Sequence, residues 1–106
     1  MNLRLRRGDR SEQPTEPDDT VTIARISPRS RVRIRGQVVQ MRQRPASGLP
    51  SLVITISDGT GRAVAVWSGR RALGGVTLGR SLVIEGIPVA TADGPVFHNP
   101  TYTLLA

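Results

Sequence analysis

Few side chains in this sequence could act as acids, bases or nucleophiles. Beyond residue 20 the chain has one histidine, His98, and three carboxylates, Asp58, Glu85 and Asp93. Asp58 and Asp93 stand beside glycine in turn sequences, where aspartate has an ordinary structural role, and Glu85 is expected as a solvated charge on a strand. Their spacing fits neither a metal site nor a phosphate-binding loop that leads into a helix. We therefore predict no catalytic residue, no metal and no cofactor, and an ordinary surface position for His98.

Arginine is the residue type that points to a function. All 15 basic residues are arginines, against 8 acids, which gives a formal net charge of +7. The first 20 residues hold four of these arginines and five of the acids, which leaves 11 arginines and three acids, a net charge of +8, in the rest. Guanidinium groups bind phosphate in bidentate fashion and stack on bases. A GC-rich coding genome also produces an arginine bias, and the two explanations do not exclude each other.

A set of arginines on or beside the predicted strands is the candidate for phosphate contacts. Its members are Arg33, Arg35, Arg42, Arg44, Arg62, Arg70 and Arg71. The alternative is a scattered, solvated surface, because long charged side chains also cover apolar area.

Trp67 is the candidate platform for base stacking. Proteins that bind single strands combine a basic groove with aromatic side chains on which bases stack. If Val64 and Val66 face the core, Trp67 faces outward; if the parity is reversed, Trp67 lies inside with Ala63 and Ala65. We expect the outward orientation from the pattern alone.

The segments that must position these side chains read as β-strands. The central stretch, 52–69, is LVITISDGTGRAVAVWSG, in which residue types alternate on both sides of a DGTG turn at 58–61. This alternation predicts a β-hairpin, and glycines accept the positive φ that turns require. Glycines inside the longer patterns, Gly36 and Gly86, predict bends. The strands are expected near Val32–Arg44, Leu52–Ser57, Arg62–Ser68, Ser81–Thr91 and Val96–Leu105.

The remaining segments precede or connect these strands. Residues 1–20 are polar and have almost nothing to bury, so we expect a disordered tail before one domain at 21–106. Val21–Ile26 is expected to pack across one end of the domain, as a strand or as a helical turn. Residues 45–50 read as a loop. Residues 69–76 read as a short helix or turn, whose apolar side chains plug one end of the domain: Ala72, Leu73 and Val76.

This order of elements predicts an all-β protein. Closing five strands into a barrel removes exposed sheet edges. The expected fold is therefore a five-stranded Greek-key β-barrel, the OB-fold, with a short helix or turn between its third and fourth strands.

Residues 31–102 resemble OB-fold nucleic-acid-binding domains of the anticodon-binding type. They are similar to the wedge domain of RecG-type branch-migration helicases and to small stand-alone OB-fold proteins of actinobacteria. The matching features are VRIRGQV (32–38), LVITISDGTG (52–61), VW (66–67), Gly86 and N-P-x-Y (99–102). The sequence contains no P-loop and no helicase motif, so the resemblance implies a binding module without ATPase activity.

We predict a non-catalytic module that binds single-stranded or junction DNA, or RNA, through arginine–phosphate contacts with limited stacking. DNA is favoured over RNA as the partner. The alternative is a protein–protein adaptor, or a subunit of a larger complex, that uses the same barrel face. A low aromatic content, 3% of residues, favours the adaptor, whereas the charge of the domain opposes it.

The composition also bears on location. The sequence contains no cysteine, no signal peptide is visible, and no apolar run approaches the ~20 residues that a membrane helix needs. We expect a cytoplasmic protein without disulfides and without a membrane partner.

Overall fold

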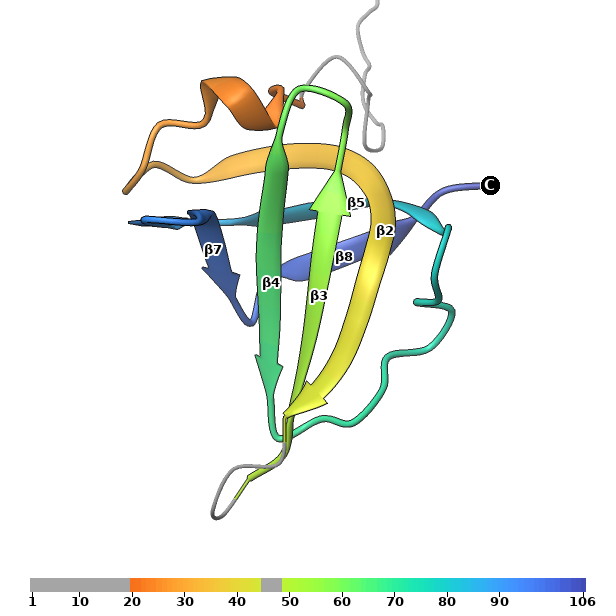
Figure 1. Cartoon of the computed structure of the whole chain (residues 1–106). Helices are drawn as coiled ribbons and strands as arrows, with labels where there is room; N and C mark the ends of the chain where they lie inside the picture. The colour runs from red at the N-terminus through yellow and green to blue at the C-terminus, as the bar shows by residue number, and fades with distance from the viewer. Residues whose placement is uncertain (1–19, 45–48) are drawn as a thin grey trace, which may run out of the picture.

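In the computed structural model of this chain, which describes residues 20–44 and 49–106, strands and turns make up almost the whole fold (Figure 1). The predicted tail lies outside the described residues except for Thr20. The elements are η2 (Ile23–Arg25), β2 (Val32–Arg44), β3 (Ser51–Ser57), β4 (Arg62–Ser68), β5 (Ser81–Gly86), β6 (Val89–Thr91), β7 (Gly94–His98) and β8 (Thr101–Leu104).

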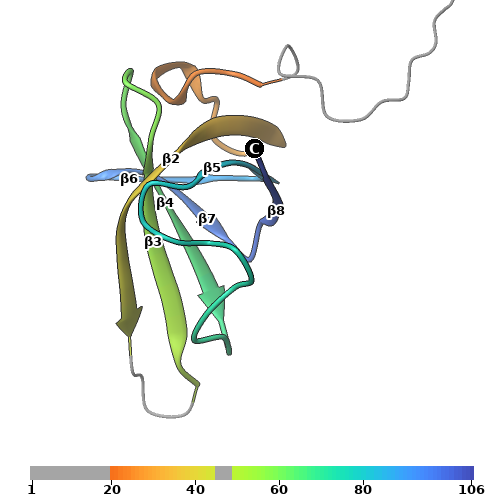
Figure 2. The same ribbon diagram turned by 90° about the vertical axis from the view of Figure 1, so that its right-hand side faces the viewer.

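The strands form one sheet that closes on itself. Its strand order is β6-β7-β4-β3-β2-β5-β8. β7 and β8 are two parts of one stretch, 94–104, interrupted by Asn99 and Pro100. β7 pairs in parallel with β4, and β8 pairs antiparallel with β5. The stretch therefore connects the β4 side of the sheet to the β5 side and closes the barrel, as the two views show (Figures 1 and 2).

The all-β OB-fold prediction is confirmed. Each of the last two predicted strands is broken in two, because a proline cannot donate a hydrogen bond to the ladder. Pro88 separates β5 from β6, and Asn99–Pro100 separates β7 from β8. Residues 69–80, between β4 and β5, contain turns and no helix, so the turn alternative is the correct one.

β2 bends so that it pairs with two different strands. Its first half pairs with β5 and its second half with β3, and the register shifts between Val38 and Gln40. The shift turns Val39 outward, where it is 41% exposed. Gly36 stands just before the shift, and a Cβ atom there would lie 2.9 Å from the Ser57 carbonyl oxygen. The bend thus requires a residue without a side chain at this position.

Aliphatic side chains fill the barrel around the fully buried ring of Phe97. Leu73 and Val76, from the segment between β4 and β5, join this core as predicted, whereas Ala72 is exposed and does not. Ile23 joins it from η2. The other fully buried aliphatic residues of the barrel include Ile34, Val38, Ile54, Ile56, Leu82 and Ile84.

The segment before β2 combines the two predicted alternatives. Val21 forms an isolated parallel bridge with Ile34, and its N–H donates to the Arg33 carbonyl oxygen at 2.8 Å. One 3₁₀ turn, η2, follows at once and brings Ile23 into the core. The segment thus packs across one end of the barrel.

The DGTG turn between β3 and β4 holds this segment in place. Asp58 Oδ2 accepts a hydrogen bond from the Ile23 N–H at 2.8 Å, and Thr60 Oγ1 accepts one from the Ala24 N–H at 3.1 Å. Partial burial alone would raise the pKa of Asp58. Hydrogen bonds from the Thr60 hydroxyl and from the N–H groups of Ile23, Thr60 and Gly61 outweigh burial and hold the pKa below its usual value. The DGTG motif therefore has a structural role: it fixes η2 against the end of the barrel.

Candidate nucleic-acid interface

One side of the barrel presents a broad uncovered surface made by β2, β3, β4 and β7. The in-register pairs align Arg42, Val53, Val66 and His98 in one row across these strands. No described segment crosses in front of β3 and β4 (Figure 1). We call this surface the outer sheet face. By strand alternation its residues are Gln40, Arg42, Arg44, Ser51, Val53, Thr55, Arg62, Val64, Val66, Ser68, Val96 and His98.

The charge on the outer sheet face is positive. Arg42, Arg44 and Arg62 are exposed on it. Within residues 20–44 and 49–106, the ion pairs found both involve Glu85, and none involves these three arginines. The described side-chain carboxylates do not belong to this face: Asp58 and Asp93 lie in turns, the turn of Asp93 being next to the Arg62 backbone, and Glu85 lies on β5. Charges of one sign on an open surface attract and orient an anionic polymer.

The middle of the outer sheet face is aliphatic. Val53 and Val66 are directly paired across β3 and β4, and they are only 5% and 8% exposed although they lie outside the barrel core. Thr55 forms a weak hydrogen bond with Gln40 at 3.5 Å in the next row. The surface therefore has arginines around a compact apolar centre, and it carries the imidazole of His98 but no Phe, Tyr or Trp ring.

Trp67 faces the interior, and the prediction that it faces outward is wrong. Its side chain is 5% exposed, and Nε1 donates to the Pro100 carbonyl oxygen at 2.9 Å. The small side chains of Ala63 and Ala65 leave room for Phe97, which pairs opposite Ala65. Trp67 completes that inner row at the end of β4. A buried ring with a bonded N–H offers no stacking platform on the outer sheet face.

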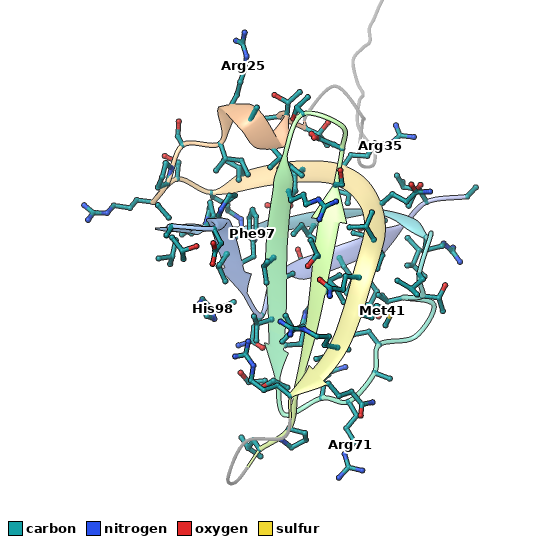
Figure 3. All side chains as sticks on the ribbon, viewed as in Figure 1. Arg25, Arg35, Met41, Arg71, Phe97 and His98 are labelled. Carbon is teal, nitrogen blue, oxygen red and sulfur yellow. The ribbon has the colours of Figure 1, made fainter. Side chains whose placement is uncertain are left out.

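The bend in β2 separates Arg33 and Arg35 from the other candidates. Arg33 lies beside Glu85, with Nε 3.5 Å from the carboxylate, and Arg31 contacts the same carboxylate at 2.8 Å. Arg35 lines a groove of about 700 Å³ that Asp58 also lines. Figure 3 shows Arg35 near the DGTG end of the barrel, far from Arg71.

Arg70 and Arg71 lie just beyond β4, at the opposite end of the barrel from η2. The turn is fixed by a hydrogen bond of 2.7 Å from the Gly69 N–H to the Pro50 carbonyl oxygen. Gln43 Nε2 donates to the Arg71 carbonyl oxygen at 3.1 Å, so the segment lies beside the end of β2. Arg71 projects away from the barrel (Figure 3). The structure thus gathers Arg42, Arg44, Arg70 and Arg71 toward one end and leaves Arg62 near the other.

A hollow next to Arg70 opens between the end of β4 and β8. Its volume is about 360 Å³, and its lining includes Trp67, Arg70, Asn99 and Tyr102. The Tyr102 ring meets Trp67 edge to face, with centroids 6.1 Å apart and an interplanar angle of 79°. In the sequence, Asn99 and Tyr102 stand out only as parts of the N-P-x-Y motif of the family resemblance. The N-P-x-Y motif was the signal available for this hollow.

Other kinds of site find no support in the described part of the chain. No group of three or more His, Cys, Asp or Glu side chains there could hold a metal ion. His98 is an exposed strand residue, as expected. No helix among the described residues is long and apolar enough to cross a membrane.

Comparison with known proteins adds evidence on the fold. No protein-family model matches the sequence, and no curated protein matches it. The structure is similar to the solution NMR structure of a replication factor A related protein from Methanobacterium thermoautotrophicum, with a TM-score of 0.61 and 16% sequence identity. The match covers 87% of this chain and 96% of that one. At this identity the likeness concerns the fold, which is the OB-fold; the finer resemblance to RecG-type wedge domains stays a prediction.

Proposed function

We propose that this chain is a non-catalytic OB-fold module that binds single-stranded nucleic acid across the outer sheet face. The observation that carries the proposal is an uncovered face whose exposed arginines have no carboxylate partner among the described residues. OB-folds commonly bind oligonucleotides on this part of the barrel.

Arginine–phosphate contacts supply the affinity in this proposal. Arg42 and Arg44 would hold phosphates along β2, and Arg62 would hold one on β4, with sugars and bases over the aliphatic centre. Each phosphate that a guanidinium neutralises releases counterions, so binding is salt-dependent and weakly selective for sequence. Trp67 and Phe97 are buried. Stacking on the outer sheet face is therefore limited to guanidinium planes and the exposed imidazole of His98.

DNA is the ligand that we expect. Phosphates and base faces are common to DNA and RNA, so the arginines alone do not discriminate between them. The similar solved structure is named for its relation to replication factor A, and on that ground we favour DNA. Single strands and forked duplexes both present a flexible strand that this face can accept.

The test is a titration of labelled oligo-dT, oligo-U and a forked duplex, each at two salt concentrations. We expect all three to bind, more weakly at higher salt, with oligo-dT ahead of oligo-U. Binding that is absent at low salt for every ligand would overturn the proposal.

A protein–protein adaptor is the second candidate, and the aliphatic side chains favour it. Val64 and Val96 are paired across β4 and β7, and Val89, 52% exposed, extends their row to the edge of the sheet. Peptides use such surfaces and edges. Retention on heparin discriminates between the two, because an adaptor elutes at low salt whereas a phosphate-binding face holds on to the column.

A further inference from the structure

The hollow beside Arg70 has the composition of a nucleotide site. We propose that it binds one nucleotide of the strand, with the base against the Tyr102 ring and a phosphate on Arg70. This inference rests on the proposed function and gives it a second, separate site, outside the outer sheet face.

The exposure of the aromatic residues points to Tyr102 as the residue that contacts the base. The chain has three, Trp67, Phe97 and Tyr102, and all lie in the described part. Phe97 and Trp67 are 0% and 5% exposed, whereas Tyr102 is only partly buried and lines the hollow. Among these three rings, Tyr102 is therefore the one on which a base can stack. The edge-to-face contact with Trp67 fixes the ring.

The polar groups of the hollow suit an anionic ligand. Arg70 is exposed and makes no hydrogen bond or ion pair within the described residues. Asn99 Oδ1 accepts a hydrogen bond from the Ser68 N–H at 3.0 Å, so the amide is held and its Nδ2 faces no described acceptor. No carboxylate lines the hollow. The free groups are thus donors, which suits phosphate and base carbonyl oxygens.

The hollow lies next to one end of the outer sheet face. Arg44, Ser51 and Ser68 form the last paired row of the outer sheet face, and Arg70 follows Ser68 by two residues. Gly69, with φ of +78°, turns the chain between them. A strand that crosses the outer sheet face toward Arg44 therefore reaches the hollow by bending around the end of β4. The volume, about 360 Å³, lies in the range of small-ligand sites.

Trp67 gives the experiment its signal. It is the sole tryptophan of the chain and lies in the wall of the hollow. We expect its fluorescence to change saturably when AMP or TMP is added at up to millimolar concentration, and when oligo-dT is added. Inorganic phosphate alone should produce a smaller change, because it cannot stack on Tyr102.

Matched variants separate the two sites. Arg70→Gln should abolish the response to mononucleotides, and Tyr102→Leu should raise their dissociation constant roughly 5- to 150-fold, the usual range for losing one stacked base. Tyr102→Phe keeps the ring and should retain binding. The double variant Arg42→Gln, Arg44→Gln should weaken oligo-dT binding and leave the mononucleotide response unchanged.

Two results would overturn the inference. One is a lack of any Trp67 response to mononucleotides; the other is a response that Arg70→Gln leaves intact. Arg70 is exposed, so its replacement tests the site even if Tyr102→Leu proves too unstable. The proposed function fails differently, when oligo-dT does not bind or binds equally well to the Arg42–Arg44 double variant.

Discussion

The indole N–H of Trp67 donates a hydrogen bond of 2.9 Å to the carbonyl oxygen of Pro100, across the end of the barrel. Two further hydrogen bonds join the end of β4 to Asn99, the residue before Pro100. The Asn99 N–H donates to the Val66 carbonyl oxygen at 2.7 Å, and Asn99 Oδ1 accepts from the Ser68 N–H at 3.0 Å. Asn99 has a φ of +52°, which asparagine tolerates better than most residues. The N-P-x-Y motif therefore builds the corner between β7, which pairs with β4, and β8, which pairs with β5.

Replacing Trp67 tests this corner. Trp67→Phe keeps an aromatic ring but leaves the Pro100 carbonyl oxygen without its donor, which should cost about 1–3 kcal/mol. Trp67→Ala also opens a cavity and should cost about 3–5 kcal/mol. Denaturant unfolding measures both free energies. Equal stability of the two variants would mean that the ring volume contributes nothing here.

Gly36→Val should lower the melting temperature markedly, because its Cβ would crowd the Ser57 carbonyl oxygen at 2.9 Å. Gly74→Ala is the matched control, since nothing lies within 4 Å of its added Cβ and its φ is not positive. The control should melt at or slightly above the temperature of the parent. Similar melting temperatures for Gly36→Val and the parent would show that the barrel tolerates a side chain at the bend.

Asp58→Asn should make the stability of the barrel less dependent on pH. The folded-state pKa of Asp58 lies below the usual 3.8, so its ionised form stabilises the fold above that pH. The contribution is lost as the pH falls through the folded-state pKa. The variant should be less stable than the parent at pH 7, and the difference should shrink as the pH falls below about 4. Unfolding curves measured between pH 2 and 7 test this. A difference in stability between variant and parent that stays constant over this range would show that the hydrogen bonds of residue 58 do not depend on its charge.

The salt dependence of binding should identify the arginines that contact phosphate. Removing Arg42 and Arg44 together should reduce the slope of log K against log salt by about 1.4 for a single strand, at ~0.7 for each contact. Arg25→Gln with Arg29→Gln removes the same charge from exposed positions at and after the end of η2, and should change the slope much less. Equal slopes for the two double variants would show that the whole charge of the domain acts, rather than this face.

Sequence alone predicted the backbone well, because glycine, proline and period-two alternation act locally. β2 and β4 have the predicted bounds, and the bend predicted at Gly36 lies just before the observed register shift between Val38 and Gln40. The predicted orientation of Trp67 was wrong because β4 is apolar on both faces. Val64 and Val66 lie on one face and Ala63 and Ala65 on the other, so the alternation of residue types did not indicate which face is buried.

The candidate site was harder to predict because it depends on contacts between distant residues. The bend in β2 places Arg33 and Arg42 on different sides of the barrel, although both belong to one strand. Likewise, the DGTG motif suggested only a turn. Its bond to Ile23 joins residues 35 apart in sequence, and no local pattern reports such a contact.

The closing stretch, 94–104, has a consequence for how the protein is made. A ribosome that has synthesised residues 21–93 has produced every other strand, yet the free edges of β4 and β5 have no partner until residues 94–104 emerge. Exposed edges of this kind pair with other chains. The nascent protein thus depends on residues 94–104 for protection against aggregation, and premature termination near Asp93 should yield insoluble chains rather than a smaller domain.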